Sequence, residues 1–140
     1  MKDTLRPGLS QTETRIVDVA RTIDFMGEDL RIYATPELLR DIEFTSRNLL
    51  LDHCDVGEDS VGVSAAFDHS AATPLGMTVH ITVTVAGLEG RRVVLDIVAT
   101  DAIEEICRGQ HTRFIVDMAK TKQRLVAKIA KADAAKEPAR

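Results

Sequence analysis

The sequence predicts an α+β fold in which one antiparallel sheet wraps around a single long helix. One internal segment, beginning at about residue 35, has apolar residues at clear helical spacing. From residue 59 to residue 117, apolar and polar residues alternate as they do in half-buried strands. A second helical pattern closes the chain. A helix followed by strands joined through short turns is typical of an α+β domain with the helix on one sheet face.

The first third of the chain predicts a weak strand, an irregular connection and the long helix. The strand is expected from Thr12 to Val19, and the connection covers residues 24–29 around Gly27. The helix is expected from Thr35 to about His53, because threonine is a good cap and Pro36 suits the first helical position. Its apolar positions are Leu38, Leu39, Ile42, Leu49 and Leu50.

Four strands are expected after the helix. The first spans residues 59–69 and the second residues 77–85; a turn at residues 88–91 around Gly90 leads to the third, and the last spans residues 104–117 with a bend near Gly109. In the first strand, one face would hold Val61, Val63, Ala65, Phe67 and His69. The third strand would bury Val93, Leu95, Ile97 and Ala99.

The C-terminal segment differs from the rest of the chain in charge. Residues 118–140 hold seven basic and two acidic side chains, whereas the preceding residues hold 11 basic and 20 acidic ones. A helix is expected over residues 118–132, and residues 132–140 are expected to fray. The basic charge is either a solvated helix end or a landing site for a phosphate-bearing ligand.

Composition indicates one domain, residues 1–140, of an ordinary cytoplasmic protein. The chain has 44% hydrophobic and 29% charged residues. The N-terminus lacks a signal-peptide core, and no apolar run approaches the ~20 residues of a membrane span, so we expect no membrane association. An acidic chain with 4% aromatic residues and no binding motif is not expected to bind nucleic acid. Cys54 and Cys107 form no zinc or redox pattern, and neither a metal nor a cofactor is expected.

His69 is the first candidate for chemistry. It ends the alternating strand, shares a face with Phe67, and precedes the small residues Ser70, Ala71 and Ala72. It is either a satisfied core histidine or an imidazole beside a pocket that exchanges protons near pH 7.

Glu43 and Thr35 are the next candidates, both on the long helix. Glu43 is either a solvated partner of Arg47 at i,i+4 or an interfacial carboxylate with a raised pKa that acts as base or nucleophile. Thr35 is the expected helix cap, and the backbone N–H groups at a helix start suit a developing oxyanion.

The sequence resembles the hotdog thioesterases of the fluoroacetyl-CoA thioesterase type. The resemblance rests on "YATPELLRDIE", "GEDSVGVSAAFDHSAATPLGMTV", "LEGRRVVLDIVATD" and "GQHTRFIVD", which together cover roughly residues 33–117. It implies a hotdog fold and a catalytic set of Thr35, Glu43 and His69. It also implies contributions to substrate binding from Gly62, Gly76 and Arg113. The segment before Thr35 has only Phe25 as an aromatic residue, so no particular acyl group is implied.

The expected reaction is hydrolysis of a small or medium acyl-CoA thioester to free acid and CoA. CoA belongs to the substrate, and its phosphates are expected near Arg91, Arg92 or the lysines of the C-terminal segment. Eight helical residues rise about 12 Å, so Thr35 and Glu43 of one straight helix cannot both reach one acyl carbon. If both act, either the first turn of the helix is irregular or the site combines residues of two subunits, and we expect a homodimer with active sites at the subunit interface. The alternatives are a non-catalytic acyl-CoA binding module and another hotdog enzyme, such as an acyl-CoA hydratase.

Overall fold

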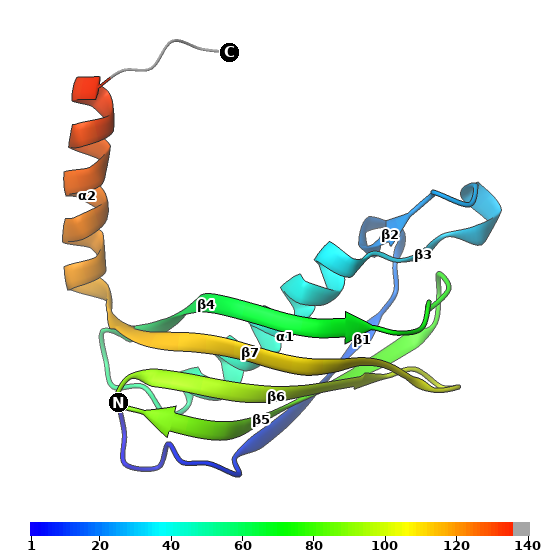
Figure 1. The fold of residues 1–140 in the computed structure, drawn as a ribbon, viewed down its shortest axis with the longest axis horizontal. Coiled ribbons are helices and arrows are strands. Elements are labelled where there is room, and N and C mark those ends of the chain that lie inside the picture. Colours follow the sequence, from blue (N-terminus) through cyan, green and yellow to red (C-terminus); the bar gives the residue numbers. More distant parts are fainter. Residues whose placement is uncertain (136–140) are drawn as a thin grey trace.

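The computed structural model describes residues 1–135, which form a curved antiparallel sheet, a long helix and a projecting C-terminal helix (Figure 1). The strands are β1 (Ser10–Ile16), β2 (Thr22–Ile23), β3 (Ile32–Tyr33), β4 (Glu58–His69), β5 (Thr78–Glu89), β6 (Arg92–Thr100) and β7 (Glu105–Asp117). The helices are α1 (Thr35–Leu51) and α2 (Met118–Ala135), with 3-10 turns at Val19–Arg21 and Glu28–Leu30. Within the described residues, no helix is both long and apolar enough to cross a membrane.

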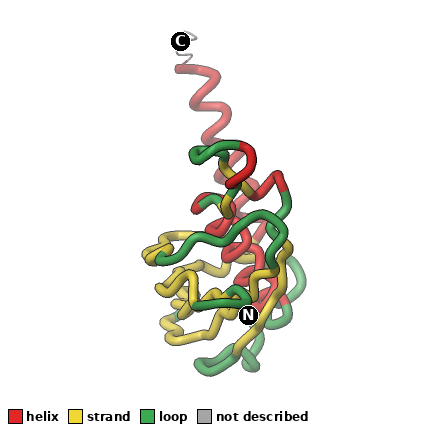
Figure 2. Tube along the Cα trace, turned by 90° about the vertical axis from the view of Figure 1, so that its right-hand side faces the viewer, coloured by secondary structure: helices red, strands yellow, loops and turns green. Residues whose placement is uncertain are grey.

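Five strands form the main sheet, in the order β1-β5-β6-β7-β4, and every neighbouring pair is antiparallel. Strand β4 is therefore an edge strand. Figure 2 shows α1 against one face of this sheet, while α2 extends beyond both layers. These features confirm the predicted architecture of a sheet wrapped around one long helix.

The core lies between α1 and the inner faces of β5 and β6. Eight alternating side chains of these two strands are at most 1% exposed, namely Val79, Ile81, Val83, Val85, Val93, Leu95, Ile97 and Ala99. Leu38, Ile42 and Leu50 of α1 are fully buried against them. Each such Leu, Ile or Val side chain contributes roughly 1.5–3 kcal/mol through burial. The alternation predicted for these strands is confirmed.

The face assignment in β4 is only partly right. A bulge between Gly62 and Ser64 shifts the register against β7. A bulge places one extra residue in a strand and reverses the parity beyond it. Val61 and Val63 are consequently 44% and 52% exposed, whereas Phe67 packs against the core, as predicted.

Helix ends and the N-terminal connection also differ from expectation. Ala34, not Thr35, is the residue before the first turn of α1, and no side chain caps that turn. Helix α1 ends at Leu51 and β1 at Ile16, earlier than predicted. The N-terminal connection carries a small hairpin, β2–β3, that the prediction lacked.

Helix α2 continues to Ala135, so the predicted fraying of residues 132–140 is wrong for residues 132–135. Residues 136–140 lie outside the described part of the chain. No described side chain of α2 is buried.

Candidate active site

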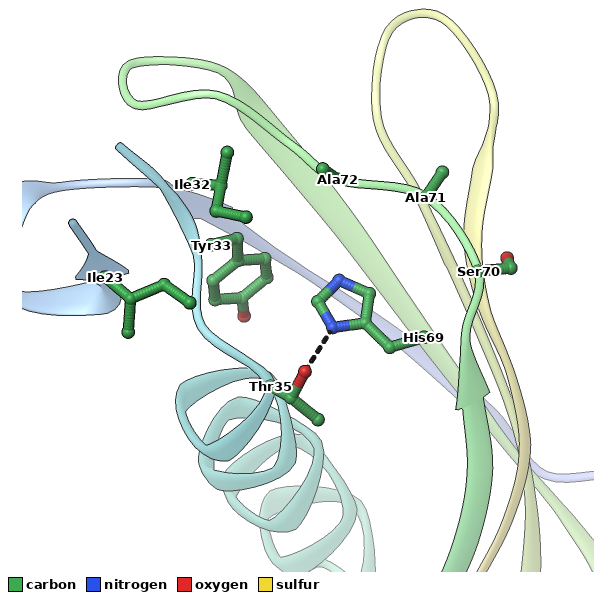
Figure 3. Close-up of a pocket in the computed structure, with 8 residues that line it drawn as sticks. All are labelled: Ile23, Ile32, Tyr33, Thr35, His69, Ser70, Ala71 and Ala72. Atoms are coloured by element: carbon green, nitrogen blue, oxygen red, sulfur yellow. Dashed lines mark hydrogen bonds between the residues drawn. The ribbon is translucent and has the colours of Figure 1, made fainter. Parts of the chain in front are cut away.

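The start of α1 and the end of β4 bring Thr35 and His69 together. The Thr35 hydroxyl and His69 Nδ1 are hydrogen-bonded at 2.8 Å (Figure 3). Beside the pair lies a cavity of about 230 Å³. Its other lining residues are Ile23, Ile32, Tyr33, Ser70, Ala71 and Ala72, so the three small residues predicted to leave room beside the ring do line this cavity.

His69 is electrostatically suited to proton transfer. Its Nε2 atom is buried and has no hydrogen-bond partner among residues 1–135. Burial lowers the pKa of His69 below its ordinary value of 6.5, so the ring is neutral at pH 7. Buried polar atoms in folded proteins almost always have partners. An unpartnered imidazole nitrogen beside a cavity therefore indicates a group that meets a ligand.

Tyr33 packs against His69, and Asp41 holds Tyr33 in place. The Tyr33 ring lies edge-on to the His69 ring, with centroids 6.3 Å apart. The buried Tyr33 hydroxyl donates to Asp41, whose carboxylate also accepts from Arg21 at 2.9 Å. Burial and the Asp41 carboxylate raise the pKa of Tyr33, so the hydroxyl remains a donor. The sequence analysis missed this support, because Tyr33 and Asp41 form no recognisable spacing with His69.

Glu43 lies in a second cluster, on the side of α1 that faces β4 and β7. Its Oε2 atom is 3.5 Å from Nη1 of the buried Arg113. Arg113 also donates to the hydroxyl and to the carbonyl of Ser60, both at 2.8 Å. The alternative pairing of Glu43 with Arg47 is wrong, because Arg47 binds Asp59 at 2.7 Å.

His111 completes this second cluster and was not predicted. Its Nδ1 lies 2.8 Å from the Ser64 carbonyl, which can only accept, so Nδ1 carries the proton. Nε2 then accepts from Arg113 Nη1 at 3.2 Å. Burial lowers the pKa of His111, in keeping with this neutral tautomer. The sequence does indicate that His111 and Arg113 act together, because their i,i+2 spacing places both on one face of β7.

The two glycines named from the resemblance occupy different surroundings. A Cβ on Gly62 would lie 3.2 Å from Glu43 Oε2 and 3.4 Å from His111 Cε1, so this glycine adjoins the second cluster. Gly76 lies in the loop after the cavity residues, with a φ of 93° that favours glycine, and it does not line the cavity.

One chain therefore carries two separate clusters, the Thr35–His69 pair and the Glu43–His111–Arg113 cluster. Thr35 and Glu43 are eight residues apart on α1, or about 12 Å along the helix axis. Thr35 contacts His69 at the end of β4, whereas Glu43 contacts Arg113 within β7. The structure does not bring Glu43 to the Thr35–His69 pair within one chain. Among residues 1–135, no group of three His, Cys, Asp or Glu side chains could hold a metal ion.

Comparison with known proteins identifies a family. Residues 17–119 match the family described as fluoroacetyl-CoA-specific thioesterase. The fluoroacetyl-CoA thioesterase of Streptantibioticus cattleyicolor is 29% identical over 127 residues, which cover 86% of this chain and 91% of that protein.

Solved structures agree with this match. A variant of the fluoroacetyl-CoA-specific thioesterase superposes with a TM-score of 0.83 at 28% identity, covering 91% of this chain and 99% of that one. A hot-dog-like protein from Thermanaerovibrio acidaminovorans gives 0.79 at 26% identity, covering 87% and 91% of the two chains. A thioesterase superfamily member from Thermus thermophilus shares the fold, with a TM-score of 0.85 at 23% identity over 96% of this chain and 99% of that one. The predicted hotdog fold and the predicted family are both confirmed.

Proposed function

The chain belongs to the fluoroacetyl-CoA-specific thioesterase family and is an acyl-CoA thioesterase, and we propose that it hydrolyses small acyl groups at a site built from two subunits. The observation that carries the proposal is the buried, unpartnered Nε2 of His69, which is hydrogen-bonded through Nδ1 to Thr35 beside a small cavity. The catalytic residues of the proposal are Thr35, Glu43 and His69, with Gly62 and Arg113 beside the reacting groups.

Strand β4 is the proposed dimer contact. It is a 12-residue edge strand, and its exposed Val61 and Val63 would be a liability on a monomer. Phe44, on the neighbouring side of α1, is 43% exposed. We place the two β4 strands antiparallel, in the register that sets the His69 end of one chain opposite the Gly62 region of the other. That arrangement joins the Thr35–His69 half-site of one subunit to the Glu43–Arg113 half-site of its partner.

The proposed chemistry follows from these positions. Glu43 either attacks the thioester carbonyl or takes a proton from an attacking water. The Thr35 N–H is available for the developing oxyanion, because the N–H groups of Glu37 and Leu38 already donate to the Ala34 carbonyl. Thr35 orients the imidazole, and the neutral His69 ring takes the proton released by the attacking water, directly or through Glu43, and passes it to the departing CoA sulfur. Where Glu43 itself attacks, the CoA thiolate leaves, and water then hydrolyses the acyl-Glu43 anhydride and supplies that proton. The products are the free acid and CoA.

The small cavity supports a short acyl group. A variant of the fluoroacetyl-CoA-specific thioesterase has been solved with fluoroacetate and CoA, and another variant of that enzyme with acetyl-CoA. The cavity here has a volume of only about 230 Å³, which suits a short acyl group. A cytoplasmic location is part of the proposal, and the two buried free thiols accord with it.

Thiol release from a panel of acyl-CoAs of increasing length tests this function. Wild-type protein should release thiol from the shortest acyl-CoAs, and His69→Ala should reduce kcat by at least ~100-fold. His80→Ala is the matched control, since the exposed His80 side chain lies on β5 and is hydrogen-bonded to Thr14, away from the cavity. Acyl-CoA binding without turnover by wild type would favour a binding module, and addition of water to an enoyl-CoA would favour a hydratase.

A further inference from the structure

A second cavity lies at the opposite end of the sheet from the Thr35–His69 pair. It has a volume of about 190 Å³ and is formed where β7 passes into α2. Figure 1 shows that the start of α2 and the turn between β5 and β6 lie at this same end. Its lining residues are Arg91, Phe114, Ile115, Val116, Asp117, Lys120, Thr121 and Arg124.

Three cations from two elements converge on this cavity. Lys120 and Arg124 are four residues apart on α2 and therefore share one helix face. Neither has an acidic partner within 4 Å among residues 1–135. Arg91 reaches the cavity from the β5–β6 turn and binds Glu58 at 2.8 Å. Glu58 also binds the N-terminal ammonium, so its charge is shared between two cations.

The remaining lining residues suit a nucleotide. Phe114 is 41% exposed and presents a ring face on which a base can stack. Asp117 is the only carboxylate in the lining, and its Oδ1 accepts the Lys120 N–H at the start of α2. The cavity thus carries net positive charge beside an aromatic surface, the chemistry that recognises a phosphorylated nucleoside.

We propose that Arg91, Lys120 and Arg124 bind the nucleotide phosphates of an acyl-CoA whose acyl group lies in the partner subunit's cavity. This inference rests on the proposed function and its β4–β4 dimer. Within one chain, the eleven residues from Glu58 to His69 span roughly 36 Å, beyond the reach of the pantetheine arm. In the register proposed for that dimer, the partner's His69 lies near Gly62, and Gly62 pairs with Arg113 within its own chain. From Arg113 to Asp117 the distance along β7 is only about 13 Å.

Of the basic residues that the sequence suggested for the CoA phosphates, Arg91 lines this cavity and most of the others do not. Arg92 lies beside Glu89 and Val94, at a different surface cavity. Of the α2 lysines, only Lys120 lines the nucleotide cavity. Lys122 is two residues away on another side of the helix, and Lys128 lies a further turn beyond Arg124.

The test compares acyl-CoA with the matching acyl-pantetheine thioester, which lacks the nucleotide. Lys120→Gln/Arg124→Gln should raise KM for acyl-CoA by roughly tenfold, and it should leave kcat/KM for acyl-pantetheine within about twofold. Lys122→Gln/Lys128→Gln removes the same charge from the same helix and is the control, with both substrates expected to be unaffected. The KM of wild type for acyl-CoA should also rise with salt, more steeply than that of the first variant.

Each outcome separates this inference from the proposed function. If wild type hydrolyses both thioesters and the two double variants show equal KM values for acyl-CoA, the cavity does not bind the nucleotide. If wild type hydrolyses neither thioester, the proposed function itself fails. Equal losses on both substrates in the first variant would show a structural effect of α2 and would also overturn the inference.

Discussion

Substituting Gly62 by alanine tests whether Glu43 must occupy its observed position. The new Cβ would lie 3.2 Å from Glu43 Oε2 and 3.6 Å from Arg113 Nη1. A contact at 3.2 Å is tighter than ordinary packing, so the carboxylate must move by a few tenths of an ångström. Because Glu43 is 45% exposed, its side chain has room to move away without disturbing the core.

The expected magnitude follows from that displacement. A misplacement of about 1 Å in a catalytic group can cost roughly 100-fold in rate, so a few tenths should lower kcat by about tenfold. The free energy of unfolding should change by less than ~1 kcal/mol, since no core side chain shifts. The substitution therefore separates activity from stability.

The assay is steady-state hydrolysis of a short acyl-CoA, with thermal melting and size-exclusion chromatography on the same samples. Gly87→Ala is the matched control, because the nearest atom to its added Cβ, in Val94, is at an ordinary 4.0 Å. Full activity in Gly62→Ala with an unchanged dimer would refute the role given to Glu43. A large fall in melting temperature would instead show that Gly62 is needed for folding.

Three further predictions concern Thr35, His69 and Gly109. Thr35→Val should lower kcat/KM by roughly 5- to 100-fold, because it leaves His69 Nδ1 buried without its partner. Thr35→Ser keeps the hydroxyl and should retain most activity. Equal losses of kcat/KM in the two variants would refute the role of this hydrogen bond. Burial lowers the His69 pKa below 6.5, so the ring is neutral above that pH. In a pH–rate profile, kcat/KM should therefore fall only as the pH drops through a midpoint below 6.5. A profile that rises on acidification would contradict a neutral imidazole. Gly109→Ala should lower the free energy of unfolding by more than ~2 kcal/mol, because its Cβ would lie 2.3 Å from the Ala66 carbonyl oxygen. Denaturant unfolding measures this loss, and an unchanged unfolding midpoint would be inconsistent with the close approach.

The sequence predicted the elements whose side chains repeat with a clear period. Strand β6, and β5 as far as Val85, alternate regularly, so their buried faces could be assigned residue by residue. In β4 the same reasoning failed at Val61 and Val63, because a bulge leaves no mark in the periodicity. The start of α1 at Thr35 was predicted correctly, but the cap was misassigned by one residue, because the Thr35 hydroxyl is engaged with His69 rather than with the first helical turn.

The candidate site was predictable only where residue type and local context pointed the same way. His69 stood out because a histidine and three small residues end an apolar strand. Tyr33 and Asp41 support it through contacts that the fold creates, and sequence spacing does not encode such contacts. His111 could not be placed, because strand β7 alternates too weakly to show which of its faces is buried.

Complementation between two inactive variants tests the two-subunit site most directly. His69→Ala and Glu43→Ala chains are unfolded together, refolded as mixed dimers and assayed on a short acyl-CoA. In the proposed arrangement one site of each mixed dimer contains both native residues, so an equal mixture should regain about one quarter of wild-type activity. If chromatography of tagged chains shows mixed dimers and activity stays at the level of the separate variants, each site belongs to a single chain and the account is wrong.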